Sequence, residues 1–525
     1  MNKRAIATAL AGATGALLLA VSAGATADPI RIMRDNCLSC HTELDGRFSR
    51  ISDLRKTPEG WLMTLARMQI VHDVRLNDAD RRELVKHLAD TQGLAPAETS
   101  GVRYALERRL NTQESFDSQE FTEMCGRCHS GARGLLQRRT EAEWEYLMHF
   151  HLGQYPTTEY QALGRDRDWF DLALNMVPAL AQKLPFDSRE WNAWRRYRPA
   201  LVAGAWSVSG TQPGKGTFHG TMQVRPTGTR DEFRVELDAR FDDGSALRGS
   251  GQAVIYTGYE WRANIDVGGV PMRQVLALDS GVLQGRMFQR EHDEIGADFV
   301  AARLAAGPRI IGVHPGYIKA GTMAELTIVG AALRGTPRMP DGVQVTRVLD
   351  RSPGRWVVEV RADASAIGVH AVAIGAAQGG TLAVYDRVAA VKVVPDYAVA
   401  RVGGGGGSTP PVQARFEAEA WAAGPDGEAG TGDDIRIGIM PATWSVSPFD
   451  EGAEADNDVR FAGRMDTDTG VFMPAVAGPN PQRRMSANNV GNLNVTAEVN
   501  DGGNTVQGQG HLIVTVQRWN NPPIP

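Results

Sequence analysis

The pentapeptides CLSCH (residues 37–41) and CGRCH (residues 125–129) constrain this chain more than any other feature of its sequence. Both follow the pattern Cys-x-x-Cys-His, and together they use all four cysteines of the 525 residues. Two thiols at this spacing, followed directly by His, are typical of covalent haem c attachment. The thiols add to the two vinyl groups of the haem, and the imidazole becomes an axial ligand of the iron. The sequence therefore predicts two haem c groups.

The two motifs assign the covalent and axial positions. We expect Cys37 and Cys40 to hold the first haem, with His41 as its axial ligand. The second haem takes Cys125, Cys128 and His129. A zinc site of four thiolates is one alternative, but it does not require a His after each second Cys. A thioredoxin-like redox pair is another, but it expects a βαβ context and a single copy.

An internal repeat predicts the distal iron ligands. TPEGWLMTLARM (57–68) aligns without gaps with TEAEWEYLMHFH (140–151). The aligned pairs include two threonines, two tryptophans and, at the last position, Met68 with His151. The spacing i, i+4, i+7 places the Trp and this last residue on one helical face. Met and His are both common distal ligands in cytochromes, so we assign Met68 to the first haem and His151 to the second.

Four other residues compete for these distal positions, and the repeat alone does not remove them. Met63 and His72 compete at the first haem, and His149 and Met176 at the second. Thioether ligation raises a haem potential relative to imidazole. With Met68 as ligand, the first haem has the higher potential, and electrons flow from the second haem to the first and then to an outside acceptor.

The N-terminus predicts export of the chain. Basic MNKR precedes a small-residue apolar run and the segment ATAD, which is the order of a secretory signal peptide (1–27) with cleavage after Ala27. A membrane anchor is the alternative, but the run barely reaches the ~18–20 residues that a span needs. The net charge of −5 implies neither a nucleic-acid partner nor an anionic membrane surface.

The pattern of the chain changes from helical to β near residue 200. Helical periods mark 78–90, 101–110 and 140–152, with capping signals in LND (76–78) and SFDSQE (115–120). We therefore predict a multidomain chain in which an all-α dihaem cytochrome c domain is followed by three all-β domains. Their predicted ranges are 28–200 for the dihaem domain, 201–306 for an antiparallel β-barrel, 307–400 for an immunoglobulin-like domain, 401–411 for a Gly-rich linker and 412–525 for a C-terminal β-sandwich.

The β part shows no catalytic signature. It lacks G-x-S-x-G, H-E-x-x-H, a P-loop and a dinucleotide fingerprint. Its scattered histidines are expected to be ordinary structural residues: His219, His292, His314, His370 and His511. One acidic loop, PDGEAGTGDD (425–434), is a weak calcium candidate through Asp426, Glu428, Asp433 and Asp434, and a solvated turn is the favoured interpretation.

A signal peptide, two Cys-x-x-Cys-His sites and three β domains in this order resemble the α subunit of quinohemoprotein amine dehydrogenase. The resemblance spans essentially the whole mature chain, and CLSCH and CGRCH carry it most strongly. It implies a periplasmic heterotrimer that oxidises primary amines to aldehydes and ammonia.

In that family a β-propeller subunit and a small γ subunit with a cysteine tryptophylquinone accompany the α subunit. The α subunit passes electrons through its haems to a soluble blue copper protein or cytochrome c. Because the haems use every thiol of this chain, the quinone must lie on a partner, and no catalytic residue is expected here. Two alternatives remain: a dihaem peroxidase, and a stand-alone dihaem electron carrier whose β domains bind partners.

Overall fold

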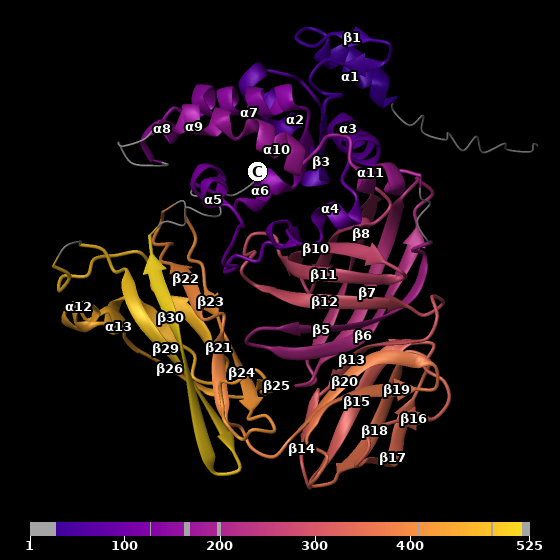
Figure 1. Cartoon of the computed structure of the whole chain (residues 1–525), viewed down its shortest axis with the longest axis vertical. Helices are drawn as coiled ribbons and strands as arrows, with labels where there is room; N and C mark the ends of the chain where they lie inside the picture. The colour runs from indigo at the N-terminus through magenta and orange to yellow at the C-terminus, as the bar shows by residue number, and fades with distance from the viewer. Residues whose placement is uncertain are drawn as a thin grey trace, which may run out of the picture.

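A helical unit at the N-terminus is followed by three β units (Figure 1). The computed structural model describes residues 28–126, 128–161, 168–196, 201–407, 409–484 and 487–516. The predicted signal peptide lies outside this range. Among the described residues, no helix has both the length and the apolar character that a membrane crossing requires.

Helices dominate the N-terminal unit, but four short strands join them, where the sequence predicted helices alone. The helices are α1 (Pro29–Cys37), α2 (Pro58–His72), α3 (Asp78–Thr91), α4 (Pro96–Thr99), η1 (Arg103–Ala105), α5 (Gln119–Cys125), α6 (Ala132–Leu135), α7 (Glu141–Gln154), α8 (Thr158–Gln161), α9 (Trp169–Asn175), α10 (Val177–Lys183) and α11 (Arg189–Trp194). The strands are β1 (Glu43–Leu44), β2 (Arg47–Phe48), β3 (Leu54–Lys56) and β4 (Gln137–Arg139).

Two of the three predicted helices are confirmed, and one is wrong. Helices α3 and α7 cover 78–90 and 140–152 almost entirely, and Asn77 and Ser118 cap α3 and α5 as the sequence indicated. Over 101–110 only the short 3₁₀ turn η1 forms. Two causes are visible. Arg108 has φ of 55°, which ends a right-handed helix. In addition, the barrel residue Arg286 donates hydrogen bonds to the carbonyl oxygens of residues 107 and 108.

The two halves of the internal repeat meet in a two-stranded antiparallel sheet. Strand β3 leads into α2, and β4 leads into α7. Arg55 lies directly opposite Arg138 in this sheet, and the two are equivalent positions of the repeat. The pairing therefore gives the halves a local two-fold relation. Since side chains alternate along a strand, the two arginines project from one face, and Lys56 and Arg139 project from the other.

The second unit is a closed eight-stranded barrel, which confirms the predicted barrel. Its strands follow the order β10-β11-β12-β5-β6-β7-β8-β9, with every neighbouring pair antiparallel. Strand β7 alternates exposed and buried residues, as its sequence indicated. Aromatic side chains such as Trp206, Phe218 and Trp261 fill the interior. The strands are β5 (Gly204–Gln212), β6 (Gly216–Pro226), β7 (Glu232–Phe241), β8 (Ala246–Tyr256), β9 (Glu260–Val267), β10 (Val270–Asp279), β11 (Val282–Gln289) and β12 (Gly296–Arg303).

The third unit consists of two four-stranded sheets around one apolar core. One sheet has the order β13-β15-β18-β17 and the other the order β14-β20-β19-β16. The strands are β13 (Arg309–His314), β14 (Tyr317–Lys319), β15 (Met323–Ala331), β16 (Pro337–Arg338), β17 (Val343–Arg351), β18 (Arg355–Ala362), β19 (Gly368–Ile374) and β20 (Ala377–Tyr385).

The last unit begins earlier in the chain than the sequence predicted. Strands β21 (Ala390–Val394) and β22 (Tyr397–Arg401), which were expected in the third unit, pair with β24 (Glu417–Ala422) and β30 (Asn504–Thr515). The remaining elements are β23 (Ala414–Arg415), β25 (Ile435–Met440), β26 (Thr443–Pro448), α12 (Glu451–Ala455), α13 (Asp458–Phe461), β27 (Gly463–Met465), β28 (Val471–Pro474) and β29 (Gly491–Asp501).

The Gly-rich segment 401–411 lies inside this last unit and does not connect two domains. The backbones of Arg401 and Val412 exchange two hydrogen bonds of 2.9 Å, which close the segment into a loop. Ala400 and Ala414, on its two sides, belong to one apolar core. The prediction of an interdomain linker was therefore wrong. Glycine content indicates backbone freedom, but it does not indicate which strands the flanking segments pair with.

The barrel supports the helical unit from below in Figure 1. At the turn between β8 and β9, the Thr257 N–H donates to Asp90 at 2.7 Å, and the Thr257 hydroxyl donates to the carbonyl of Ala89 at 3.0 Å. Beside this turn, Arg262 binds both carboxylate oxygens of Glu59, at 2.5 and 3.2 Å. Glu59 belongs to the first turn of α2, so the barrel fixes the start of the helix that carries Met68.

Candidate haem sites

The first motif starts at the end of a helix and folds into a tight turn. Cys37 is the last residue of α1, and its carbonyl accepts from the N–H groups of Cys40 (3.2 Å) and His41 (2.9 Å). The Nδ1 atom of His41 lies 2.8 Å from the carbonyl oxygen of Ser49. With Nδ1 as donor, the lone pair is on Nε2, which is the arrangement of a metal-binding histidine.

The second motif repeats this arrangement. Cys125 is the last residue of α5, and His129 Nδ1 lies 2.9 Å from the carbonyl oxygen of Ser130. Glu114 supports the loop, since its carboxylate accepts from the Ser130 hydroxyl and, at 2.8 Å, from the N–H of Gly131. Burial, together with the nearby charge of Arg133, lowers the pKa of His129 to about 4. The imidazole is therefore neutral at physiological pH, which is the form that ligates iron.

The four cysteines form no disulfide with one another, and Cys37 and Cys125 are partly buried. Burial raises the pKa of Cys37, and it raises the pKa of Cys125 to about 12. A zinc thiolate site needs several ionised sulfurs at one point. Among the described residues, no group of three or more Cys, His, Asp or Glu side chains is arranged to hold a metal ion. This finding also applies to the acidic loop 425–434, the weak calcium candidate.

A cavity of about 560 Å³ lies against the first motif. Its volume is within the range typical of cofactor pockets, about 300–1,000 Å³. Both thiols and the imidazole of the first motif line it, and so do Met68 and His72. Its apolar wall consists of Met33, Ile51, Leu54, Trp61, Leu65, Val74, Leu76, Leu84, Leu88, Leu147 and Phe150. These residues fit a haem, which needs a largely apolar site with candidate iron ligands in its wall.

The structure separates the distal candidates of the first haem. Met63 does not line the cavity; its sulfur accepts from Arg133 Nη2 at 3.0 Å. Met68 and His72 both line it, one helical turn apart on α2. Geometry therefore disfavours Met63 and leaves two candidates.

At the second motif, His151 and His149 point in different directions. His151 is largely buried beside Trp169, and its Nδ1 lies 2.8 Å from the carbonyl oxygen of Leu147, so Nε2 is again available. His149 is half-exposed and lines the first cavity. Met176 packs against the same apolar core as Cys125 and Trp169.

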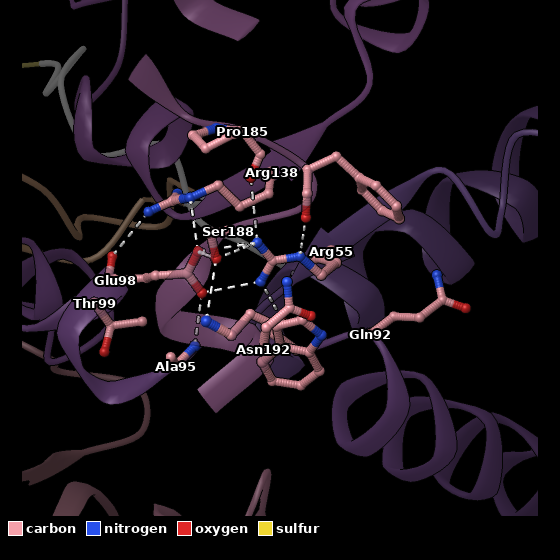
Figure 2. Close-up of polar contacts among 12 residues, drawn as sticks. Arg55, Gln92, Ala95, Glu98, Thr99, Arg138, Pro185, Ser188 and Asn192 are labelled. Atoms are coloured by element: carbon pink, nitrogen blue, oxygen red, sulfur yellow. Dashed lines mark hydrogen bonds and ion pairs between the residues drawn. The ribbon is translucent and has the colours of Figure 1, made fainter. Parts of the chain in front are cut away.

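A buried ion cluster lies between the two halves at the β3–β4 pair. Figure 2 shows Arg55 and Arg138 reaching the same carboxylate, that of Glu98. Arg55 binds it through two hydrogen bonds of 2.9 Å, and Arg138 Nε lies 3.1 Å away. Ser188 adds a donor at 2.8 Å. Burial alone would raise the pKa of Glu98, but the hydrogen bonds from Arg55 and the charge of Arg138 lower it, so the carboxylate is ionised.

Sequence reasoning missed the cations of β3 and β4. LRKT (54–57) and QRRT (137–140) are equivalent segments, directly before the repeat that was recognised. Extending the alignment by three residues toward the N-terminus finds them. The missed residues occupy equivalent positions of the repeat: Arg55 corresponds to Arg138, and Lys56 corresponds to Arg139. Each histidine of the β units that was expected to be ordinary has a structural partner. These pairs are His219 with Arg355, His292 with Glu294, His314 with Ser209, His370 with Ala366, and His511 with Asn492.

Comparison with protein families assigns the whole chain to one family. Residues 27–191 match the model described as quinohemoprotein amine dehydrogenase A, alpha subunit, haem binding. Three further models of the same alpha subunit match in order: domain II at 199–304, domain III at 307–386 and domain IV at 391–524. The chain belongs to the quinohemoprotein amine dehydrogenase alpha-subunit family. The family confirms a haem-binding N-terminal region and membership of an amine dehydrogenase with partner subunits.

Solved structures add little to this assignment of the alpha subunit. A redesigned β-barrel, mFAP1 bound to DFHBI, is 18% identical over 19% of this chain and 91% of its own, with a TM-score of 0.17. The SGBP-B protein of Bacteroides ovatus in complex with a mixed-linkage heptasaccharide is 10% identical over 61% and 65%, with a TM-score of 0.19. Drosophila N-cadherin EC1-3 is 12% identical over 55% and 91%, with a TM-score of 0.20. Likenesses this distant carry no argument. A search of the curated proteins found no match.

Proposed function

We propose that this alpha subunit is a dihaem electron conduit of a periplasmic amine dehydrogenase. The observation that carries the proposal is the shared geometry of the two motifs. In each, the first Cys ends a helix, and the His directs Nδ1 to a backbone carbonyl, which leaves Nε2 for iron. Haem c bound at such a site supplies one-electron chemistry.

The residues divide the work at each site. Cys37 and Cys40 attach the first haem covalently, and His41 binds its iron from one side. Met68 would supply the second iron ligand, with His72 as the structural alternative, because both line the cavity. At the second site, Cys125 and Cys128 would attach the haem, and His129 and His151 would supply its iron ligands through Nε2.

We propose partner subunits and a soluble electron acceptor as well. A small subunit with a cysteine tryptophylquinone oxidises the amine, a β-propeller subunit completes the complex, and a soluble blue copper protein or cytochrome c takes the electrons. In this chain, the two sheets of the third unit form an immunoglobulin-like sandwich, and the last unit is a second sandwich. A dihaem peroxidase requires an open distal position, whereas each site here has a candidate for the second iron ligand: Met68 or His72 at the first and His151 at the second.

A haem count tests the proposal directly. Pyridine haemochrome analysis of the purified mature chain should give two haems per chain, and a potentiometric titration should show two one-electron steps. A result of one haem or none contradicts the proposal. Smaller subunits that purify with this chain distinguish the amine dehydrogenase from a stand-alone carrier.

A further inference from the structure

The two faces of the β3–β4 pair differ in how their charges are balanced. On one face, Arg55 and Arg138 share the carboxylate of Glu98. On the other face, Lys56 and Arg139 line the first cavity. Arg50 and Arg67 line it as well, and Glu143 is the one carboxylate among the described lining residues. This wall therefore carries an excess of positive charge.

The single carboxylate of the wall is already shared. Glu143 accepts from Arg50 Nε at 3.0 Å and lies 3.6 Å from Arg139 Nη1. Lys56 is 5% exposed, and its ammonium group donates to the Thr64 hydroxyl at 2.7 Å; within the described chain it makes no ion pair. A buried ammonium group without an anion is costly. Burial lowers the pKa of Lys56 well below its ordinary value, and the charges of Arg139 and Arg67 lower it further. The wall is thus built for an anion that this chain does not supply.

The repeat places a cation beside a tryptophan at equivalent positions of both halves. Lys56 lies over the ring of Trp61 at 5.4 Å, and Arg139 lies over the ring of Trp144 at 5.7 Å. The indole N–H groups differ between the halves. Trp61 donates to the carbonyl of Gln92 at 3.1 Å, whereas the buried Nε1 of Trp144 has no hydrogen-bond partner among the described residues. Such an unused donor is rare in a native core.

We propose that Lys56, Arg139 and the indole N–H of Trp144 hold the propionate carboxylates of the two haems where the halves of the repeat meet. The proposal rests on the proposed function, since it requires haem at both sites. The propionates supply the anions that the cavity wall lacks and the hydrogen-bond acceptor that the indole N–H of Trp144 lacks. Lys56 serves the first haem, because it lines that cavity. Trp144 serves the second, because it belongs to the same apolar core as Cys125. Arg139 lines the first cavity and also lies over the ring of Trp144, so it serves both haems.

Potentiometric titration of three variants tests this division, after pyridine haemochrome analysis has shown two haems in each. A cation near a haem favours the reduced state, so its removal lowers the potential. Lys56→Met should reduce the equilibrium constant for reduction of the first haem about tenfold, which is ~59 mV for one electron, and leave the second unchanged. Arg139→Met should lower both potentials. Trp144→Phe should cause a smaller loss at the second haem alone.

Two controls separate the charge from the fold. Lys56→Arg keeps the charge and should restore the potential. Arg47→Met removes a cation of the same domain that pairs with Asp53 outside the cavity, and it should change neither potential. If Lys56→Met and Arg139→Met leave both potentials unchanged while both haems are present, the proposal is overturned. A haem count below two in the unmutated chain contradicts the proposed function instead.

Infrared spectroscopy of the unmutated chain gives a test that needs no variant. Propionates labelled with ¹³C through 5-aminolevulinic acid are distinguished from protein carboxylates in reduced-minus-oxidised spectra. Propionates held by these cations should be ionised at pH values at which a free propionic acid side chain is protonated. Propionates that titrate like free carboxylic acids would overturn the proposal.

Discussion

At the residue scale, two candidates remain for the proposed distal ligand of the first haem. Met68 and His72 line the same cavity. Met68→Ala should abolish the long-wavelength methionine-to-iron absorption band of the ferric protein, because this band requires a thioether on the iron. His72→Ala should leave the band intact. The measurement is the optical spectrum of each oxidised variant. A band that survives Met68→Ala excludes Met68, and a protein without the band favours His72.

The same site shows how far single residues can be read from sequence. Both motifs and the helical face with Trp61 and Met68 follow from spacing, because a covalent pattern and a helical period are local properties. The contact between Met63 and Arg133 is not local, since 70 residues separate them. The repeat therefore predicted Met68 as the ligand, but only the tertiary structure shows that Met63 does not line the cavity.

At the scale of elements, helix α2 depends on a buried ion pair with the barrel. Arg262 and Glu59 are 9% and 16% exposed, and the arginine also contacts Glu260 at 3.2 Å. Removing one partner of a buried pair leaves a charge without compensation, which costs about 3–5 kcal/mol. Arg262→Met should therefore lower the free energy of unfolding of the helical unit by roughly this amount, measured by denaturant titration of the haem signal.

A surface pair in the barrel provides the control for this loss. Lys215 and Asp243 lie 2.6 Å apart but are substantially exposed. Lys215→Met should change the free energy of unfolding by less than about 1 kcal/mol, as is usual for exposed pairs. Equal losses in the two variants would show that Arg262 does not anchor α2.

The same interface gives stability a pH dependence. Burial raises the pKa of Glu260 to about 8, against the opposing charge of Arg262, whereas an unfolded glutamate has a pKa of about 4.3. Between these values the folded chain binds the proton and the unfolded chain does not. The contribution of Glu260 is therefore fully present below about pH 4.3 and is lost as pH rises toward 8. Unfolding titrations of Glu260→Gln across this range should lack that slope; an unchanged slope assigns it to another group.

Element prediction succeeded where burial follows a regular period and failed where another domain intervened. Strand β7 alternates as its sequence does, because one face lies inside a closed barrel. The helix expected over 101–110 does not form, because Arg286 of the barrel binds the carbonyls of residues 107 and 108. A side chain 178 residues away leaves no local signal.

At the scale of the whole molecule, the proposed function requires that electrons enter from a partner subunit. A cysteine-derived quinone needs a thiol, and all four cysteines lie in the two haem motifs. The isolated chain, mixed with a primary amine, should therefore show no haem reduction in stopped-flow absorbance. Adding the quinone-bearing subunit should restore it. Amine-dependent reduction by the isolated chain contradicts the division of labour between subunits.

The order of the two haems determines the direction of flow through the complex. Thioether ligation favours ferrous iron relative to a second imidazole, so with Met68 as the proposed ligand the first haem has the higher potential. Met68→His should lower that potential and slow electron delivery to the acceptor. A loss of ~59 mV shifts the equilibrium of electron transfer from the second haem to the first tenfold toward the second. Reduction of the second haem by the quinone should be nearly unchanged, since His129 and His151 are untouched. Stopped-flow traces at wavelengths specific to each haem measure the two steps separately. Equal slowing of both steps would show that the first haem receives electrons before the second, and the direction would be reversed.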